Sequence, residues 1–394
     1  MRKAIIMLLV TFPFSSFGHG LASGPEGVTD RVIEFPDTAN YQTLTVDLHT
    51  HSVFSDGHVW PRIRVGEALR DGLDALAVTE HLEWQPHLAD IPHPDRNRAY
   101  EDAMQAVGVQ DLLIIPGSEI TREAPVGHMN AVFIKDANKL LKAPNPSADA
   151  SDTRAYYNHA GEWSAQEAVQ AANDQGAFVF WNHPYWTAQN PDGIAKIPEF
   201  HRRNARANLL HGIEIANGDT YSEEAFAIAL KHDLTLIGVS DVHNLIDWDY
   251  EPHNGGHRPV TLVLANERSL DGIREALFAQ RTVVWFKNEL YARPAEMNEL
   301  LASSINVVSA NWRGDTSVMV VRIHNRTDAT FLLRNLSRYT FMESSDIFSL
   351  PAHKTTTMQI KPGKRVDGID VKFEVLNALI APDKAARIEL SFSP

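Results

Sequence analysis

Short apolar runs alternate with amphipathic, helix-like stretches between about residues 41 and 286. This alternation is typical of repeated βα units in an α/β fold. Seven of the apolar runs predict strands: Leu44–Leu48, Ala75–Val78, Leu112–Ile115, Met129–Ile134, Ala177–Phe180, Gly212–Ile215 and Leu234–Val239. About 250 residues of alternating strand and helix favour one closed, TIM-like barrel of parallel strands over two small domains.

Start signals support the helices between these runs. Pro61 stands where the first helix would begin, and Ser164 with Glu167 three residues later forms a capping-box pattern. Ser222 and Ser269 are further candidate N-caps. These signals predict helices on the connections between the strands.

The pattern changes after about residue 300, where apolar and polar residues alternate with a period of two, as in 317–323. Such alternation predicts half-buried strands. We therefore expect a small all-β, sandwich-like accessory domain over residues 303–394, following a barrel domain over 23–302.

The first 22 residues have the pattern of a secretory signal peptide. Met1-Arg2-Lys3 precedes an apolar run from Ala4 to Phe14, and small and polar residues follow. The run is too short to span a bilayer. We expect an exported protein, periplasmic or extracellular, without stable membrane insertion.

Composition excludes several kinds of chemistry. The chain has no Cys, which excludes disulfides, thiolate metal sites, iron–sulfur clusters and thiol nucleophiles. With 36 basic and 50 acidic residues the net charge is −14. Nucleic acids and anionic membranes are therefore poor partners. The oligomeric state is left open.

Among the 18 His residues, several stand at the ends of predicted strands together with acids. The carboxyl ends of barrel strands converge at one mouth. Packed there without a cation, these groups would lose their charge or need partners, at several kcal/mol each. We expect a multinuclear site for zinc, manganese or iron. Its candidate ligands are His49, His51, Asp56, His81, Glu119, His128, His183, Asp241 and His243.

Taken in order, the motifs that carry these residues resemble the PHP (polymerase and histidinol phosphatase) family. They are His49-x-His51, Asp56, Thr79-Glu80-His81, Gly117-Ser118-Glu119, Asn182-His183-Pro184 and Ser240-Asp241-Val242-His243. The resemblance covers about residues 40–290. It implies a distorted (β/α)7 barrel and hydrolysis of phosphoesters with two or three divalent metal ions.

The resemblance also implies ligand roles. One ion would be held by His49, His51, Glu119 and Asp241, and a second by the bridging Glu119 with His128 and His183. A third would be held by Asp56, His81 and His243, where Asp56 departs from members that have histidine. Glu119, Asp241 and His243 are the predicted catalytic residues, and a hydroxide bridging two ions would be the nucleophile.

The substrate is expected to be a small phosphoester. No cluster of Arg and Lys marks the strand ends, which slightly favours a phosphodiester over a phosphomonoester. The alternatives are an amide or lactone hydrolase on the same metals, or a metal-loaded ligand-binding or adhesion protein without activity.

Residues that would contact the substrate are less specified. In the loop of residues 248–258, His257 or Arg258 would either contact an anionic oxygen or belong to a solvated surface. Tyr185 and Trp186 would wall the pocket or pack in the core. Glu80 is expected to support the ligands or the fold. Two further strand-end residues have no assigned role: Glu214 and Asn217.

Overall fold

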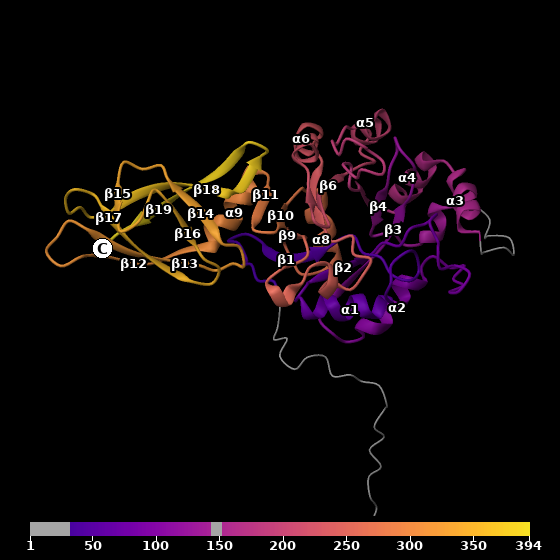
Figure 1. The fold of residues 1–394 in the computed structure, drawn as a ribbon, viewed down its shortest axis with the longest axis horizontal. Coiled ribbons are helices and arrows are strands. Elements are labelled where there is room, and N and C mark those ends of the chain that lie inside the picture. Colours follow the sequence, from indigo (N-terminus) through magenta and orange to yellow (C-terminus); the bar gives the residue numbers. More distant parts are fainter. Residues whose placement is uncertain (1–31, 143–151) are drawn as a thin grey trace, which may run out of the picture.

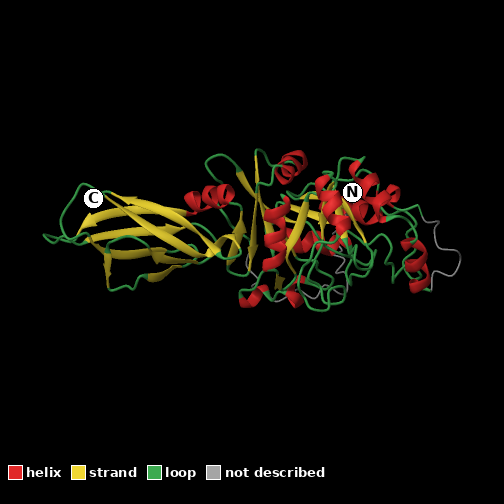
Figure 2. Cartoon of the chain, turned by 90° about the horizontal axis from the view of Figure 1, so that it is seen from above, coloured by secondary structure: helices red, strands yellow, loops and turns green. Residues whose placement is uncertain are grey.

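The computed structural model describes residues 32–142 and 152–394. The predicted signal peptide, residues 1–22, lies outside the described residues. Figures 1 and 2 show an α/β domain with a β-sandwich beside it along the long axis of the molecule. Within the described ranges, no helix is long and apolar enough to span a bilayer.

All seven predicted strands are present, and a short hairpin strand, β7 (Thr220–Tyr221), is added. They are β1 (Gln42–Asp47), β2 (Ala75–Val78), β3 (Leu113–Ile120), β4 (Met129–Val132), β5 (Phe178–Trp181), β6 (Gly212–Asn217) and β8 (Thr235–Val239).

Helices cover these strands, and several begin where the sequence predicts. The hydroxyls of Ser164, Ser222 and Ser269 each accept a backbone N–H from three residues on, which confirms them as N-caps. The helices are α1 (Pro61–Arg70), α2 (Arg98–Val107), α3 (Thr153–Gly161), α4 (Ala165–Asn173), α5 (Glu199–Arg206), α6 (Glu223–His232), α7 (Ile246–Asp249), α8 (Leu270–Phe278) and α9 (Pro294–Ser304), with short 3-10 turns η1 (Ala137–Leu140) and η2 (Pro252–Asn254).

One strand runs against the predicted direction. β1, β2 and β3 are parallel, and so are β5, β6 and β8, but β4 is antiparallel to both β3 and β5. The expectation of an all-parallel barrel is therefore wrong at β4. Only residues 121–128 separate β3 from β4, and a crossover that returns a parallel strand needs a dozen or more residues.

The first and last of the seven strands meet at their carboxyl ends. Thr50 forms a parallel bridge with Val242. The N–H of Asp241 donates to the carbonyl of His49 at 2.9 Å, and the N–H of His51 donates to that of Val242 at 3.1 Å. These contacts are consistent with a closed, distorted barrel, and they bring the segment after β1 beside the segment after β8.

Three antiparallel strands extend the sheet from the other edge of β1 into the C-terminal domain. β9 (Val260–Ala265) pairs with β1, β10 (Thr282–Phe286) pairs with β9, and β11 (Glu289–Ala292) pairs with β10. β11 then pairs in parallel with β18 (Ile369–Ala381) of the C-terminal domain. The two domains therefore share one hydrogen-bonded sheet.

The C-terminal domain is a sandwich, as its period-two pattern predicts. β13 buries Met319, Val321 and Ile323 and turns the intervening residues outward. One sheet has the order β12-β13-β17-β15, and the other contains β16, β14, β18 and β19. The strands are β12 (Ile305–Trp312), β13 (Met319–Asn325), β14 (Phe331–Asn335), β15 (Thr340–Met342), β16 (Ile347–Leu350), β17 (Thr355–Lys361) and β19 (Lys384–Phe392).

Candidate metal centre

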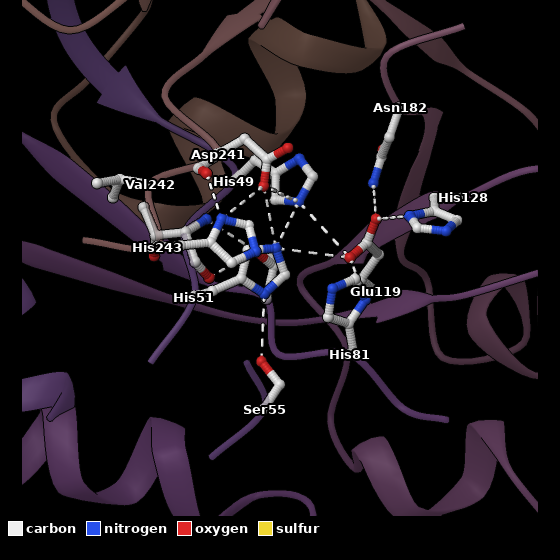
Figure 3. A network of polar contacts seen from close by, with 12 residues as sticks. His49, His51, Ser55, His81, Glu119, His128, Asn182, Asp241, Val242 and His243 are labelled. Carbon is white, nitrogen blue, oxygen red and sulfur yellow. Dashed lines mark hydrogen bonds and ion pairs between the residues drawn. The ribbon is translucent and has the colours of Figure 1, made fainter. Parts of the chain in front are cut away.

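The nine candidate ligands converge at one edge of the sheet, as Figure 3 shows for most of them. This edge holds the carboxyl ends of the parallel strands and the amino end of the antiparallel β4, which His128 precedes. His49 and His51 follow β1, and Asp241 and His243 follow β8. The bridge between Thr50 and Val242 holds these two segments side by side. His49 and His51 lie two apart on an extended segment and therefore point the same way. Asp241 instead has a left-handed backbone with φ of 50°, and its carboxylate lies within 3.2 Å of both of these imidazoles.

His49, His51 and Asp241 form the most compact group. The Nε2 atoms of the two histidines lie 2.9 Å apart. Asp241 Oδ1 lies 3.2 Å from Nε2 of His49 and 3.1 Å from Nε2 of His51. Zinc binds imidazole nitrogen at about 2.0–2.1 Å, so ligand atoms around one ion lie roughly 3 Å apart. The three atoms have the spacing of ligands that share a cation.

Glu119, on β3, occupies the middle of the cluster. Its Oε2 lies 3.5 Å from His51 Nε2 and 3.7 Å from His49 Nε2. Its Oε1 lies 3.0 Å from Nδ1 of His128 and 3.8 Å from Nε2 of His183. The two oxygens therefore face different ligand groups, which is the geometry of a bridging carboxylate.

Asp56 forms a third group with histidines from three segments. Its Oδ1 lies 3.2 Å from His243 Nε2, 3.4 Å from His81 Nε2 and 3.8 Å from His51 Nδ1. His81 is shared, because its Nδ1 also lies 2.6 Å from Glu119 Oε2. His81 therefore lies between Asp56, its expected partner at the third ion, and Glu119.

Several atoms in this cluster have no hydrogen-bond partner although they are buried: Asp56 Oδ1, Glu119 Oε2 and His128 Nδ1. Buried polar atoms in native proteins are nearly always paired. These atoms of Glu119, His128 and Asp56 lie 2.6, 3.0 and 3.2 Å from other candidate ligands. Nitrogen and oxygen donors that face one another at this spacing without a hydrogen bond fit divalent cations such as zinc, manganese or iron.

The electrostatics favour ionised acids and divide the imidazoles into two groups. Burial lowers the pKa of His51 and His128, whereas neighbouring carboxylates outweigh burial and raise the pKa of His49, His81, His183 and His243. Burial raises the pKa of the Glu119 carboxyl group, but the imidazoles of His81, His128 and His49 lower that pKa well below its usual value. Burial, with the nearby His243 and His81, lowers the pKa of His51 to about 3. A neutral His51 offers a lone pair to a cation.

A second layer of polar residues orients the ligands, and Glu214, within β6, is its clearest member. Its Oε1 lies 2.7 Å from Nδ1 of His49, and its Oε2 accepts the backbone N–H of His183 at 2.7 Å. The amide of Asn217 donates to Glu214 at 2.8 Å and to Asp241 at 3.1 Å. The predicted strand, 212–215, placed Glu214 near the mouth of the barrel, but nothing in the sequence indicated these hydrogen-bond partners.

Glu80 binds two serines, and one of them, Ser55, connects it to His51. Its carboxylate accepts hydrogen bonds from the hydroxyls of Ser52 and Ser55 at 2.5 Å. Ser55 Oγ in turn lies 3.3 Å from Nδ1 of His51. Such contacts fix the ring orientation of a ligating histidine.

The structure does not bring His257 and Arg258 into this site. Arg258 is buried, and its guanidinium donates to Asp71 at 2.6 and 2.9 Å and to Asp47 at 3.1 Å. The ring of His257 stacks on Trp285 with centroids 3.5 Å apart. Arg258 is therefore engaged in a buried ion-pair network, and we no longer assign either residue to the substrate.

A pocket of about 630 Å³ opens above the ligands. Its inner part is formed by acids and imidazoles, and Trp186 lines its outer part with 45% of its surface exposed. Tyr185 also lines it but is largely buried, with its hydroxyl donating to the carbonyl of Thr220 at 3.1 Å. Of the two roles considered for these aromatics, Trp186 walls the pocket and Tyr185 packs behind it.

The chain was compared with known proteins in three ways. A family model described as an Ig-like domain matches residues 305–391. No curated protein matches the chain significantly. Two solved structures with low overall similarity are a putative metal-dependent phosphoesterase from Bifidobacterium adolescentis (19% identity, 51% of this chain and 88% of that one, TM-score 0.36) and an amidohydrolase from Chromobacterium violaceum (17%, 50% and 87%, TM-score 0.35).

A third solved structure matches almost the whole chain. It is a two-domain protein from Bacteroides vulgatus that contains a predicted PHP-like metal-dependent phosphoesterase. It is 36% identical, the match covers 93% of this chain and 100% of that one, and the TM-score is 0.81. The match spans the α/β domain and the sandwich together. With this identity and coverage, the chain belongs to the family of two-domain PHP-like metal-dependent phosphoesterases, metal-binding hydrolases with a C-terminal Ig-like domain.

Proposed function

We propose that the protein hydrolyses small organic phosphoesters with two or three divalent ions, and that phosphodiesters are preferred. The observation that carries the proposal is the convergence of the unpaired buried atoms of Asp56, Glu119 and His128 with the close group of His49, His51 and Asp241. We propose zinc, manganese or iron, because every donor is nitrogen or oxygen.

Divalent ions in such a site lower the pKa of water toward neutrality and neutralise charge on a phosphoryl group. The protein's own residues hold and orient this machinery. Glu119 would bridge two ions, and Asn182 fixes its carboxylate by donating to Oε1 at 2.8 Å. Asp241 is held by Asn217, so its other oxygen stays directed at His49 and His51.

His243 is the candidate ligand most open to the pocket, with 33% of its side chain exposed. Its Nδ1 lies 2.8 Å from the backbone carbonyl of Asp241, which directs Nε2 toward Asp56 and the pocket. We propose that the edge of the His243 ring contacts the reacting phosphoryl group or the leaving oxygen. Asp241 and Glu119 are the other two proposed catalytic residues.

The pocket lining favours a monoanion. Among the described residues that line it, Arg154 is the single Lys or Arg, whereas the acids Glu123 and Asp219 stand near its outer part. A phosphodiester carries one negative charge and a phosphomonoester carries up to two, so a diester requires less positive charge from the protein.

We further propose that residues 1–22 direct export and that the Ig-like domain serves as an accessory module. The amide or lactone hydrolase remains the alternative reaction, since the same metals activate water toward carbonyls.

The proposal is tested on the purified mature protein by elemental analysis and a panel of chromogenic substrates. The panel contains a phosphodiester, a phosphomonoester and a carboxyl ester, assayed before chelation, after it, and after metal add-back. We expect two or three ions per chain, highest turnover on the diester, loss on chelation and recovery on add-back. Glu119→Gln should reduce turnover at least about a hundredfold, because the bridging charge is lost. Activity confined to the carboxyl ester would reject the proposal.

A further inference from the structure

Aromatic side chains line the outer part of the pocket, although no step at the metal centre requires them. They are Trp84, Tyr157, Tyr185 and Trp186. Most binding pockets combine apolar walls with a few polar groups that fix orientation. Here the acids and imidazoles of the centre form one polar part of the lining, and the aromatics supply the largest apolar side chains of the rest.

Trp186 is the most exposed of these rings. Its indole lies 5.4 Å from the ring of His183 and 5.7 Å from that of His128, measured between centroids. It therefore stands directly beside two candidate ligands, while 45% of its surface stays open. An open indole at this position leaves apolar surface in water that a bound group would cover.

The backbone fixes Trp186 in this position. The backbone N–H of Trp186 donates to the carbonyl of His183 at 2.9 Å. The backbone carbonyl of Trp186 accepts from the backbone N–H of Gln189 at 3.0 Å and from that of Asn190 at 2.8 Å. Gln189 is tied in turn to the carbonyl of Arg122 at 3.0 Å. The indole is thus presented by an anchored turn, which reduces the entropy lost on ligand binding.

A second aromatic pair lines the same pocket. The rings of Trp84 and Tyr157 meet edge to face with centroids 5.8 Å apart. The guanidinium of Arg154 lies over both rings, at 5.7 Å and 5.4 Å. These two rings and the guanidinium over them form a second, aromatic part of the pocket wall.

We propose that the pocket selects phosphoesters whose alcohol part carries a planar aromatic ring, and that Trp186 is the specificity-determining contact. The inference rests on the proposed function for the position of the phosphoryl group. When the phosphoryl group lies at the acids and imidazoles, the rest of the substrate extends along His183 and His128 and contacts the indole of Trp186. A flat ring covers the indole face and gains stacking that a saturated chain lacks.

The test measures binding and needs no turnover. Benzylphosphonate, cyclohexylmethylphosphonate and methylphosphonate carry a phosphorus–carbon bond that the hydrolase does not cleave. Their affinities for the metal-loaded full chain are measured by calorimetry. We expect benzylphosphonate to bind about tenfold tighter than methylphosphonate, with cyclohexylmethylphosphonate between them.

Variants separate the contact from a general effect. Trp186→Ala should reduce the benzyl preference to about twofold or less, and Trp186→Phe should retain most of it, because a phenyl ring still stacks. Trp248→Ala is the matched control, since Trp248 is 70% exposed and does not line the pocket. It should leave all three affinities unchanged.

Equal affinity for the benzyl and cyclohexylmethyl compounds, an unchanged preference in Trp186→Ala, or no binding of any phosphonate would overturn the inference. Failure of the proposed function has a different signature. In that case benzylphosphonate still binds through Trp186, while no phosphoester in the chromogenic panel is hydrolysed.

Discussion

At the scale of single residues, the convergence of the candidate ligands could be predicted because strand ends and residue types coincide. His49, His51 and Asp241 were expected to meet, and their ligand atoms lie within 3.2 Å of one another. Partners outside the ligand set could not be predicted. The same sequence context fits a solvated Arg258 and a buried one, and only the fold shows that Asp47 and Asp71 surround it.

Glu214 gives a prediction at this scale. In Glu214→Gln an NH2 group replaces one carboxylate oxygen, so it cannot accept both from His49 and from the backbone N–H of His183. We expect metal affinity to fall about 10–100-fold while the chain stays folded. Competition with a chromogenic chelator measures the affinity, and circular dichroism checks the fold.

The control for this variant is Glu223→Gln, since Glu223 is an exposed residue of α6. It makes the same chemical change without touching the metal centre. Unchanged metal affinity in Glu214→Gln would show that Glu214 does not orient the ligands.

At the scale of elements, strand positions followed from the apolar runs, but the direction of β4 did not. An apolar run such as 129–134 has the same periodicity in either direction. The short connection after β3 decides the direction, because it leaves no room for a crossover helix. The contact between the segments after β1 and β8 also depends on backbone contacts around Thr50 and Val242, which no local pattern encodes.

The seam between β5 and β6 gives a prediction about pH. His211 Nδ1 accepts the backbone N–H of Val179 at 2.9 Å, and its Nε2 donates to the carbonyl of Asn208 at 3.1 Å. Burial lowers the pKa of His211 to about 4, below the value of about 6.5 in an unfolded chain. The unfolded state therefore binds the proton more readily. The contribution of neutral His211 to the free energy of unfolding is complete above pH 6.5 and is lost as pH falls toward 4.

The contribution of His211 amounts to at most about 3 kcal/mol. His211→Asn keeps an acceptor for Val179 but removes the titration. The free energy of unfolding, measured in urea from pH 7 to pH 4.5, should differ less between the two proteins as pH falls. A constant difference over this range would mean that His211 titrates normally.

At the scale of the whole molecule, the Ig-like domain is joined to the α/β domain by more than a linker. β11 pairs with β18, and one apolar cluster includes Leu290 and Leu300 together with Phe331, Phe373 and Phe392. The sequence predicted both domains from their different periodicities. It could not predict this junction, because pairing between distant strands leaves no local pattern.

The junction predicts the outcome of truncation after Ser304. Removing 305–394 exposes the edge of β11 and the apolar side chains that β18 covers. We expect the shortened chain to melt at least about 10 °C lower than the full chain, or to aggregate. Thermal circular dichroism measures this, with Ile347→Ser as control, since Ile347 is 49% exposed on the outside of the sandwich. A shortened chain with unchanged melting and turnover would show an independent module.

The β11–β18 pair also prevents the rotation of the sandwich relative to the α/β domain that a flexible linker would allow. A domain attached by a flexible loop can take many orientations, whereas two domains joined by hydrogen-bonded strands keep one relative orientation. If the sandwich binds a surface, the opening of the pocket therefore has a fixed orientation relative to that surface.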